Sequence, residues 1–348
     1  MAIRSLADKV SVFNLNKENM RMNDASPGAL VTEELMVPSG DPGIDIYVRN
    51  KRPADLARFA PDNIVLFVHG ATYPAETSFD LKLDGLSWME FIAAHGYDVY
   101  LMDVRGFGHS TRPPQMDEPP EKNPPIARTA TAADDLGAVV DFILRRRGVR
   151  KICLLAWSWG TRIAGYYTAA HNDKVHRLAL YAPGWLRTSA SATDPGGALG
   201  AYRTVTVEAA KRRKRAGVPP EKQQELMSDA WFDAWANATF ATDPVGAKQN
   251  PPVLRAPNGS VQDNREFWAA GKPQYDAGAI RVPTLIIVAE WDADNPPAMS
   301  QALFAALTAA PYKRLVMIGE GTHSVMIEKN RMQLFREVQL FLDEPAPA

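Results

Sequence analysis

The pentapeptide Ala-Trp-Ser-Trp-Gly at residues 156–160 constrains the fold more than any other stretch of the chain. It follows an apolar run at residues 151–155 and precedes a segment, residues 161–170, that is typical of a helix. A sharp strand-to-helix turn needs small residues two positions before and after its central residue, because larger side chains collide there. Taken alone, the string also occurs in ordinary turns. Between a strand and a helix, it predicts that the Ser158 hydroxyl is raised beside the free N–H groups of a helix N-terminus.

The residues that would activate this serine follow in the expected order. A serine hydroxyl needs a base to take its proton and an acid to orient that base. Two further predicted strands, residues 282–290 and 314–318, are followed by loops that carry Asp292 and His323. The carboxyl ends of parallel strands meet at one edge of a sheet, so we expect Ser158, Asp292 and His323 to lie together. Asp294 lies in the same loop as Asp292 and stays open as an alternative acid.

Two more motifs complete a pattern that resembles the α/β-hydrolase family. Residues 65–72 combine a strand with His69-Gly70-Ala71, and residues 97–110 combine the next strand with Asp-x-Arg-Gly-x-Gly-x-Ser. The resemblance covers the chain from about residue 32 to residue 342 and points to a serine-nucleophile, cap-bearing, esterase- or lipase-like member. It implies an oxyanion hole formed by the backbone N–H groups of Ala71 and Trp159. For His69 we expect only an orienting hydrogen bond within its loop.

The fold class that follows is α/β, a mostly parallel central sheet with helices on both faces and an inserted helical cap. Residues 1–30 are predicted to form a loosely held N-terminal arm, and residues 31–183 and 280–348 the core. Residues 184–279 are predicted to form the cap, with helices over residues 198–216 and 220–240. A proline-rich run at residues 112–125 is expected to be a surface loop near the rim of the site.

Aromatic residues suggest what the site accepts. Tyr73, Trp157, Trp185 and Trp235 lie in or near the predicted site loops and cap, which favours an apolar or aromatic substrate. For the stripe around Trp235 as a whole, packing of the cap against the core is the stronger interpretation. The cationic run at residues 211–215 is interpreted as a solvated helix face.

Composition and charge limit the binding partners, the cell compartment and the cofactors that we expect. The net charge of −1 gives no general attraction to nucleic acid or to an anionic membrane, and no stretch of about 18 apolar residues is present to span a bilayer. Residues 1–22 lack the apolar core of a signal peptide, and the single cysteine, Cys153, is expected to be buried. We therefore expect a cytoplasmic protein. The histidines show no metal-ligand spacing, and no dinucleotide-binding glycine pattern is present, so neither metal nor cofactor is implied.

These observations predict a serine hydrolase that cleaves a small to medium apolar or aromatic carboxylic ester through an acyl-enzyme. A carbon–carbon bond hydrolase, a lactonase and an acyltransferase would use the same three residues and stay open as alternatives. A ligand-binding protein that keeps the fold is a further alternative. The expected partner is the small-molecule substrate, and the sequence leaves the oligomeric state open.

Overall fold

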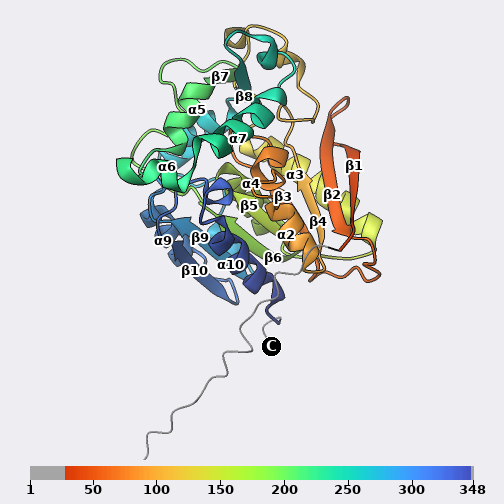
Figure 1. Cartoon of the computed structure of the whole chain (residues 1–348). Coiled ribbons are helices and arrows are strands. Elements are labelled where there is room, and N and C mark those ends of the chain that lie inside the picture. The colour runs from red at the N-terminus through yellow and green to blue at the C-terminus, as the bar shows by residue number, and fades with distance from the viewer. Residues whose placement is uncertain (1–27, 346–348) are drawn as a thin grey trace, which may run out of the picture.

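The computed structural model describes residues 28–345, so nearly all of the predicted N-terminal arm lies outside the described residues. Its centre is an eight-stranded sheet in the order β1-β2-β4-β3-β5-β6-β9-β10 (Figure 1). β1 and β2 are antiparallel to their neighbours, and the other strands are parallel. The strands are β1 (Leu30–Pro38), β2 (Asp45–Pro53), β3 (Ile64–Val68), β4 (Asp98–Met102), β5 (Ile152–Trp157), β6 (Val175–Tyr181), β9 (Thr284–Ala289) and β10 (Lys313–Ile318).

Helices cover both faces of this sheet. Alternate residues of a strand point to opposite faces, and in β3 Phe67 packs on one face while Leu66 and Val68 pack on the other. The Phe67 face is covered by α2 and α10, and the other by α3, α4 and α9. Because both faces are buried, the central strands are continuous apolar runs. The helices of the core are α1 (Ala75–Phe79), α2 (Trp88–Ala94), α3 (Thr129–Arg147), α4 (Trp159–Ala170), α9 (Pro297–Ala306) and α10 (Arg331–Asp343).

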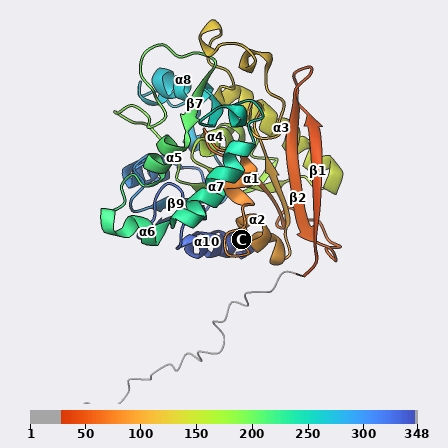
Figure 2. The ribbon, with the colours of Figure 1, turned by 45° about the horizontal axis from the view of Figure 1, so that its top comes forward.

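The chain between β6 and β9 departs from the alternation of strands and helices. Figures 1 and 2 show α5, α6 and α7 grouped on one side of the sheet. A small antiparallel pair, β7 with β8, accompanies them. The elements of this segment are β7 (Tyr202–Thr206), α5 (Val207–Lys214), α6 (Gln223–Leu226), α7 (Asp229–Ala241), β8 (Val253–Pro257) and α8 (Gly259–Asp263).

The prediction of one helix in this segment is wrong for the first half of its length. The prediction of a helix over residues 198–216 holds only from Val207, because residues 202–206 form β7. The sequence Tyr-Arg-Thr-Val-Thr in β7 is rich in aromatic and β-branched residues, which favour a strand once β8 lies alongside. The helix predicted over residues 220–240 is present as short turns and α7. Among residues 28–345, no helix has the length and apolar character needed to cross a membrane.

Candidate active site

The turn at Ser158 has the strained backbone that the sequence predicts. β5 ends at Trp157 and α4 begins at Trp159, so Ser158 makes the whole reversal, with φ 57° and ψ −121°. A positive φ costs a non-glycine residue about 1–3 kcal/mol and persists only where the surroundings enforce it. A Cβ atom on Gly160 would lie 2.3 Å from the Val68 carbonyl oxygen and 2.6 Å from that of His69. Glycine therefore lets α4 start directly against β3.

We expect Gly160→Ala to destabilise the fold by about 1–3 kcal/mol, because the added methyl group meets backbone atoms that cannot rotate away. Urea unfolding of the variant and of the wild type measures the difference. Gly40→Ala is the control, since a Cβ atom there meets nothing within 4 Å. Equal midpoints for Gly160→Ala and the wild type would show that the β3–α4 contact is looser than described.

Three strand ends bring Ser158, His323 and Asp292 together. They follow β5, β10 and β9, which run parallel in one part of the sheet. His323 Nδ1 lies 3.0 Å and 2.9 Å from the two carboxylate oxygens of Asp292. A carboxylate only accepts, so Nδ1 carries the proton, and Nε2 accepts the Ser158 Oγ–H hydrogen bond at 2.8 Å. The arrangement can pass a proton from the serine hydroxyl to the imidazole.

Asp292 is held in place by its own loop. Its Oδ1 accepts the backbone N–H groups of Asp294 at 3.0 Å and Asn295 at 2.8 Å. Burial raises the pKa of Asp292, while His323 and the Asn295 N–H oppose this increase. The carboxylate is thus oriented toward Nδ1 before any ligand arrives.

Asp294, the alternative acid, faces the opposite nitrogen of the imidazole. Its Oδ2 lies 3.7 Å from His323 Nε2. Arg213 donates its Nε–H to the same oxygen at 2.7 Å, and this guanidinium holds the pKa of Asp294 below its usual range against the effect of burial. Asp294 therefore lies on the Ser158 side of the imidazole, and Asp292 lies behind it.

The loop that carries His323 is fixed by residues at the ends of β5 and β6. Trp157 donates its indole N–H to the His323 carbonyl at 2.8 Å. Tyr181 donates its hydroxyl to the Thr322 carbonyl at 3.0 Å and accepts the N–H of Val325 at 2.8 Å. The two rings hold the backbone on both sides of His323 and so set the position of the imidazole.

The loop after β3 lies beside the serine. His69 Nε2 accepts the Val104 N–H at 3.0 Å, so its Nδ1–H donates to the Gly70 carbonyl at 2.7 Å. Burial lowers the pKa of His69, which keeps the ring neutral and suited to this orienting role. The carbonyl of the next residue, Ala71, accepts a hydrogen bond from Arg203 of β7 at 2.8 Å. The peptide units on both sides of Ala71 are therefore held in place, through the Gly70 and Ala71 carbonyls. The sequence around Arg203 gives no indication of this role.

A small cavity of about 30 Å³ lies against Ser158, and both predicted oxyanion residues line it. Its wall is mainly polar and charged rather than aromatic. The lining residues are Ala71, Ser158, Trp159, Arg162, Arg187, Ser191, Thr193, Arg213, Ser260, Asn264, Asp294 and Asn295.

The four residues predicted to bind substrate, Tyr73, Trp157, Trp185 and Trp235, lie outside this wall. Trp185 packs against Trp268 and Tyr275, and Tyr73 meets Trp235 edge-on, with ring centres 4.7 Å apart. Large rings gain most when fully buried, which explains their place in the core. The packing interpretation of the stripe is confirmed, since Phe232, Trp235 and Phe240 are all buried. Any contact of the four with substrate stays a prediction.

The interpretation of residues 211–215 as a solvated face is wrong for two of them. Arg213 reaches Asp294, and Lys214 is buried, with its ammonium 3.9 Å from the centre of the Trp235 ring. Lys214 also donates to the Ser324 hydroxyl at 3.2 Å, next to the imidazole. The composition of residues 211–215 does not reveal these contacts, because the acceptors Asp294 and Ser324 lie on loops that are remote in sequence.

Glu328 is a buried acid just beyond this group. It accepts the hydroxyl and, at 3.1 Å, the N–H of Thr322, and burial raises its pKa to about 7. Burial lowers the pKa of Lys214 to about 7 as well. Since an unfolded glutamate has a pKa of about 4.3, the native state keeps a proton on Glu328 that the unfolded chain releases. The contribution of Glu328 to stability therefore falls as pH rises from about 4 to 7.

We compare the free energy of unfolding of Glu328→Gln with that of the wild type at pH 4 and at pH 8. The difference should shift by about 2–4 kcal/mol in favour of the variant at pH 8, because the amide carries no charge to bury. Urea unfolding at both pH values measures the gap. The Lys214 contribution largely cancels, since both proteins contain it. Glu121→Gln, on an exposed side chain, is the control. A gap independent of pH would contradict the raised pKa.

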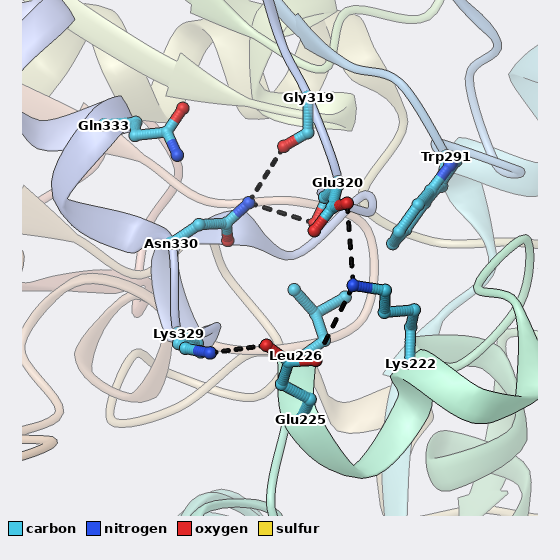
Figure 3. Close-up of a pocket in the computed structure, with 9 residues that line it drawn as sticks. All are labelled: Lys222, Glu225, Leu226, Trp291, Gly319, Glu320, Lys329, Asn330 and Gln333. Atoms are coloured by element: carbon cyan, nitrogen blue, oxygen red, sulfur yellow. Dashed lines mark hydrogen bonds and ion pairs between the residues drawn. The ribbon is translucent and has the colours of Figure 1, made fainter.

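A larger pocket, about 520 Å³, is lined by Trp291, next to Asp292, and by Gly319 and Glu320 from the loop that carries His323 (Figure 3). Its charges pair with one another. Lys329 meets Glu225 at 2.6 Å, and Lys222 lies 3.7 Å from both Glu225 and Glu320. The pocket contains none of the three residues Ser158, Asp292 and His323. Within residues 28–345, no cluster of three or more His, Cys, Asp or Glu side chains is arranged to hold a metal ion.

Solved structures with the same fold include hydrolases of several kinds. A serine hydrolase involved in carbazole degradation is 17% identical, with a TM-score of 0.61 over 90% of this chain and 99% of that chain. A meta-cleavage product hydrolase from Pseudomonas fluorescens IP01 is 13% identical, with a TM-score of 0.61 over 89% and 97%. A thermophilic esterase from Thermogutta terrifontis is 19% identical, with a TM-score of 0.53 over 89% and 98%.

Comparison with curated proteins finds no match. A family model described as the alpha/beta hydrolase fold matches residues 63–330, which is most of the chain. Together with the sheet order and the turn at Ser158, this match identifies the chain as a member of the α/β-hydrolase family.

Proposed function

We propose that the protein is a serine hydrolase that cleaves a carboxylic ester through an acyl-enzyme on Ser158. The observation that carries the proposal is the continuous hydrogen-bond chain from Ser158 through His323 to Asp292, with 2.8 Å between Ser158 Oγ and Nε2. Ser158 lies at the N-terminus of α4, whose first N–H groups have no partner within the helix.

The mechanism follows from these contacts. Ser158 Oγ attacks the ester carbonyl carbon as its proton passes to His323 Nε2, and Asp292 stabilises the imidazolium that forms. The backbone N–H groups of Ala71 and Trp159 receive the developing oxyanion. His323 then protonates the leaving alkoxide, and the alcohol departs. Water attacks the acyl-enzyme by the same route, releasing the acid and restoring Ser158.

We further propose that residues 184–279 act as a cap over this site. They contribute Arg187, Ser260 and Asn264 to the cavity wall. A volume of about 30 Å³ is too small for an ester, and a cavity of about 740 Å³ adjoins it at Thr193, Arg213 and Asp294. We propose that the substrate occupies both. The cap then determines which substrate lengths are accepted, and residues of the core carry out the reaction.

Turnover of p-nitrophenyl acetate and butyrate, followed by p-nitrophenol release, tests the proposal. The same samples, quenched early and digested, should give a peptide carrying an acyl group on Ser158 by mass spectrometry. An acyl group on another residue, or no release above the uncatalysed rate with either ester, would overturn the assignment.

Carbon–carbon bond hydrolysis is the second candidate. It needs a polar group to handle an enol, and Arg162 and Asn264 supply such groups in the wall beside Ser158. A screen that sets esters and lactones against diketones separates the two candidates. Diketone cleavage with no ester turnover would favour the second.

A further inference from the structure

The cavity at Ser158 contains three arginines, but only one is paired with a carboxylate. Arg213 meets Asp294, with a shortest distance of 2.6 Å. In the described part of the chain, no carboxylate lies within 4.0 Å of Arg162 or Arg187. Burying a cation without a carboxylate in contact costs several kcal/mol. Arg162 is such a cation, and Arg187 lies half-buried in the wall of the same cavity.

Arg162 is fixed by neutral groups only. It is 4% exposed and donates through Nη1 to Asn264 Oδ1 at 2.7 Å and through Nε to the Gly184 carbonyl at 3.4 Å. Its guanidinium also lies over the Trp268 ring, at 4.6 Å. Its Nη2 has no hydrogen-bond partner within residues 28–345. These contacts orient the fork of donors and leave one nitrogen unused.

Arg187 approaches the same cavity from the loop after β6. Its Nε and Nη2 donate to the carbonyls of Ser189 at 2.8 Å and Ala190 at 3.0 Å, and Nη1 stays unused among the described residues. Burial and the charge of Arg187 together lower the pKa of Arg162 to about 9. Both cations line the same cavity, so an anion held between them would be attracted by both.

A third donor in the wall is also without a partner. The Ser260 hydroxyl is buried and forms no hydrogen bond with any described residue, which is unusual for a native structure. Ser260 and Asn264 are four residues apart on consecutive helical turns, so they share one face. Arg162 lies in the first turn of α4, which begins directly after Ser158, and lines the same cavity. Two helix faces thus direct donors into one small space.

We propose that the substrate carries a carboxylate, bound by Arg162 and Arg187 with the Ser260 hydroxyl as an additional donor. This rests on the proposed role of Ser158 and adds the class of substrate. Ser158 and both arginines line one small cavity, so the carboxylate lies a few bonds from the scissile carbonyl. A monoester of a short dicarboxylic acid has the required groups, with the ester placed at Ser158 and the free acid at the arginines. The planar guanidinium fork can bind a carboxylate through two parallel hydrogen bonds.

The kinetic test compares p-nitrophenyl glutarate, an anion, with neutral p-nitrophenyl pentanoate, each corrected for uncatalysed hydrolysis. We expect the wild-type kcat/KM to be at least about 10-fold higher for the glutarate. Arg187→Gln should lower that preference about 10-fold, and Ser260→Ala should lower it by a smaller factor. Arg145→Gln, the same change on an exposed side chain of α3, is the control and should leave the preference unchanged. Equal kcat/KM for the two esters in the wild type would overturn the carboxylate site.

A binding test separates this inference from the proposed function. Ser158→Ala protein is titrated with glutarate, with pentanamide and with inorganic phosphate, and the change in Tm is measured. Glutarate alone should raise Tm, and Arg187→Gln in the same background should remove the increase. If glutarate binds but no ester is cleaved by the wild type, the anion site stands and the esterase proposal fails. If neutral esters are cleaved but glutarate has no effect, or phosphate is as effective, the esterase proposal stands and the carboxylate site fails.

Discussion

Ser158→Ala is expected to lower ester turnover by about 10⁵–10⁶-fold while the fold stays intact. A serine, histidine and aspartate that act as a unit lose nearly all their effect when the nucleophile is removed, about 10⁶-fold in an unrelated serine protease. Stability should hardly change, because the Ser158 hydroxyl bonds His323 and does not cap α4. Alanine also has the same difficulty as serine with the positive φ.

Turnover of p-nitrophenyl butyrate and a urea unfolding curve together check this expectation. A fluorophosphonate probe should label the wild type and leave the variant unlabelled. Ser39→Ala, in the turn between β1 and β2, is the matched control. Activity near the wild-type level in a folded Ser158→Ala protein would mean that the nucleophile lies elsewhere.

Asp292→Asn is expected to have the second-largest effect, lowering kcat by about 10³–10⁴-fold. The amide cannot hold His323 with its proton on Nδ1, so Nε2 becomes protonated and cannot accept the Ser158 proton. The contacts at 2.9 Å and 3.0 Å to Nδ1 belong to Asp292 alone among the described acids.

Asp294→Asn makes the same chemical change two residues away and is the matched comparison. It leaves the Nδ1 contact in place and removes the partner of Arg213, so we expect a much smaller decrease in kcat. Steady-state rates for both variants, with circular dichroism to check folding, decide between the two acids. A larger loss in Asp294→Asn would show that Asp294 is the catalytic acid.

Much of the fold could be predicted because its signals are local. The apolar runs of the strands, the small residues around Ser158 and the loops carrying Asp292 and His323 all lie in short stretches of sequence. The predicted strand at residues 282–290 corresponds to β9, and the predicted strand at residues 314–318 corresponds to β10. Cys153 is buried as expected.

The remainder depends on contacts between distant parts of the chain. β7 is a strand only because β8, about fifty residues later, pairs with it. Arg213 and Lys214 turn inward toward Asp294 and Ser324, which are roughly 80 and 110 residues away. The sequence does not indicate the polar and charged cavity wall for the same reason, since Arg162, Arg187 and Ser260 come from three separate elements. The residue pattern within one segment does not show which distant segments it contacts.

The attachment of the His323 loop to Trp157 and Tyr181 has a consequence for how this protein can change. Nucleophile and base are aligned by the strands themselves, because the residue before Ser158 holds the histidine backbone and the last residue of β6 holds its neighbours. The segment between β6 and β9 supplies much of the cavity wall, and Lys214, which bonds Ser324 in this loop, is not one of the wall residues. Its wall residues are therefore free to diverge, or to be replaced by design, under selection for a new substrate while the alignment of nucleophile and base is inherited unchanged.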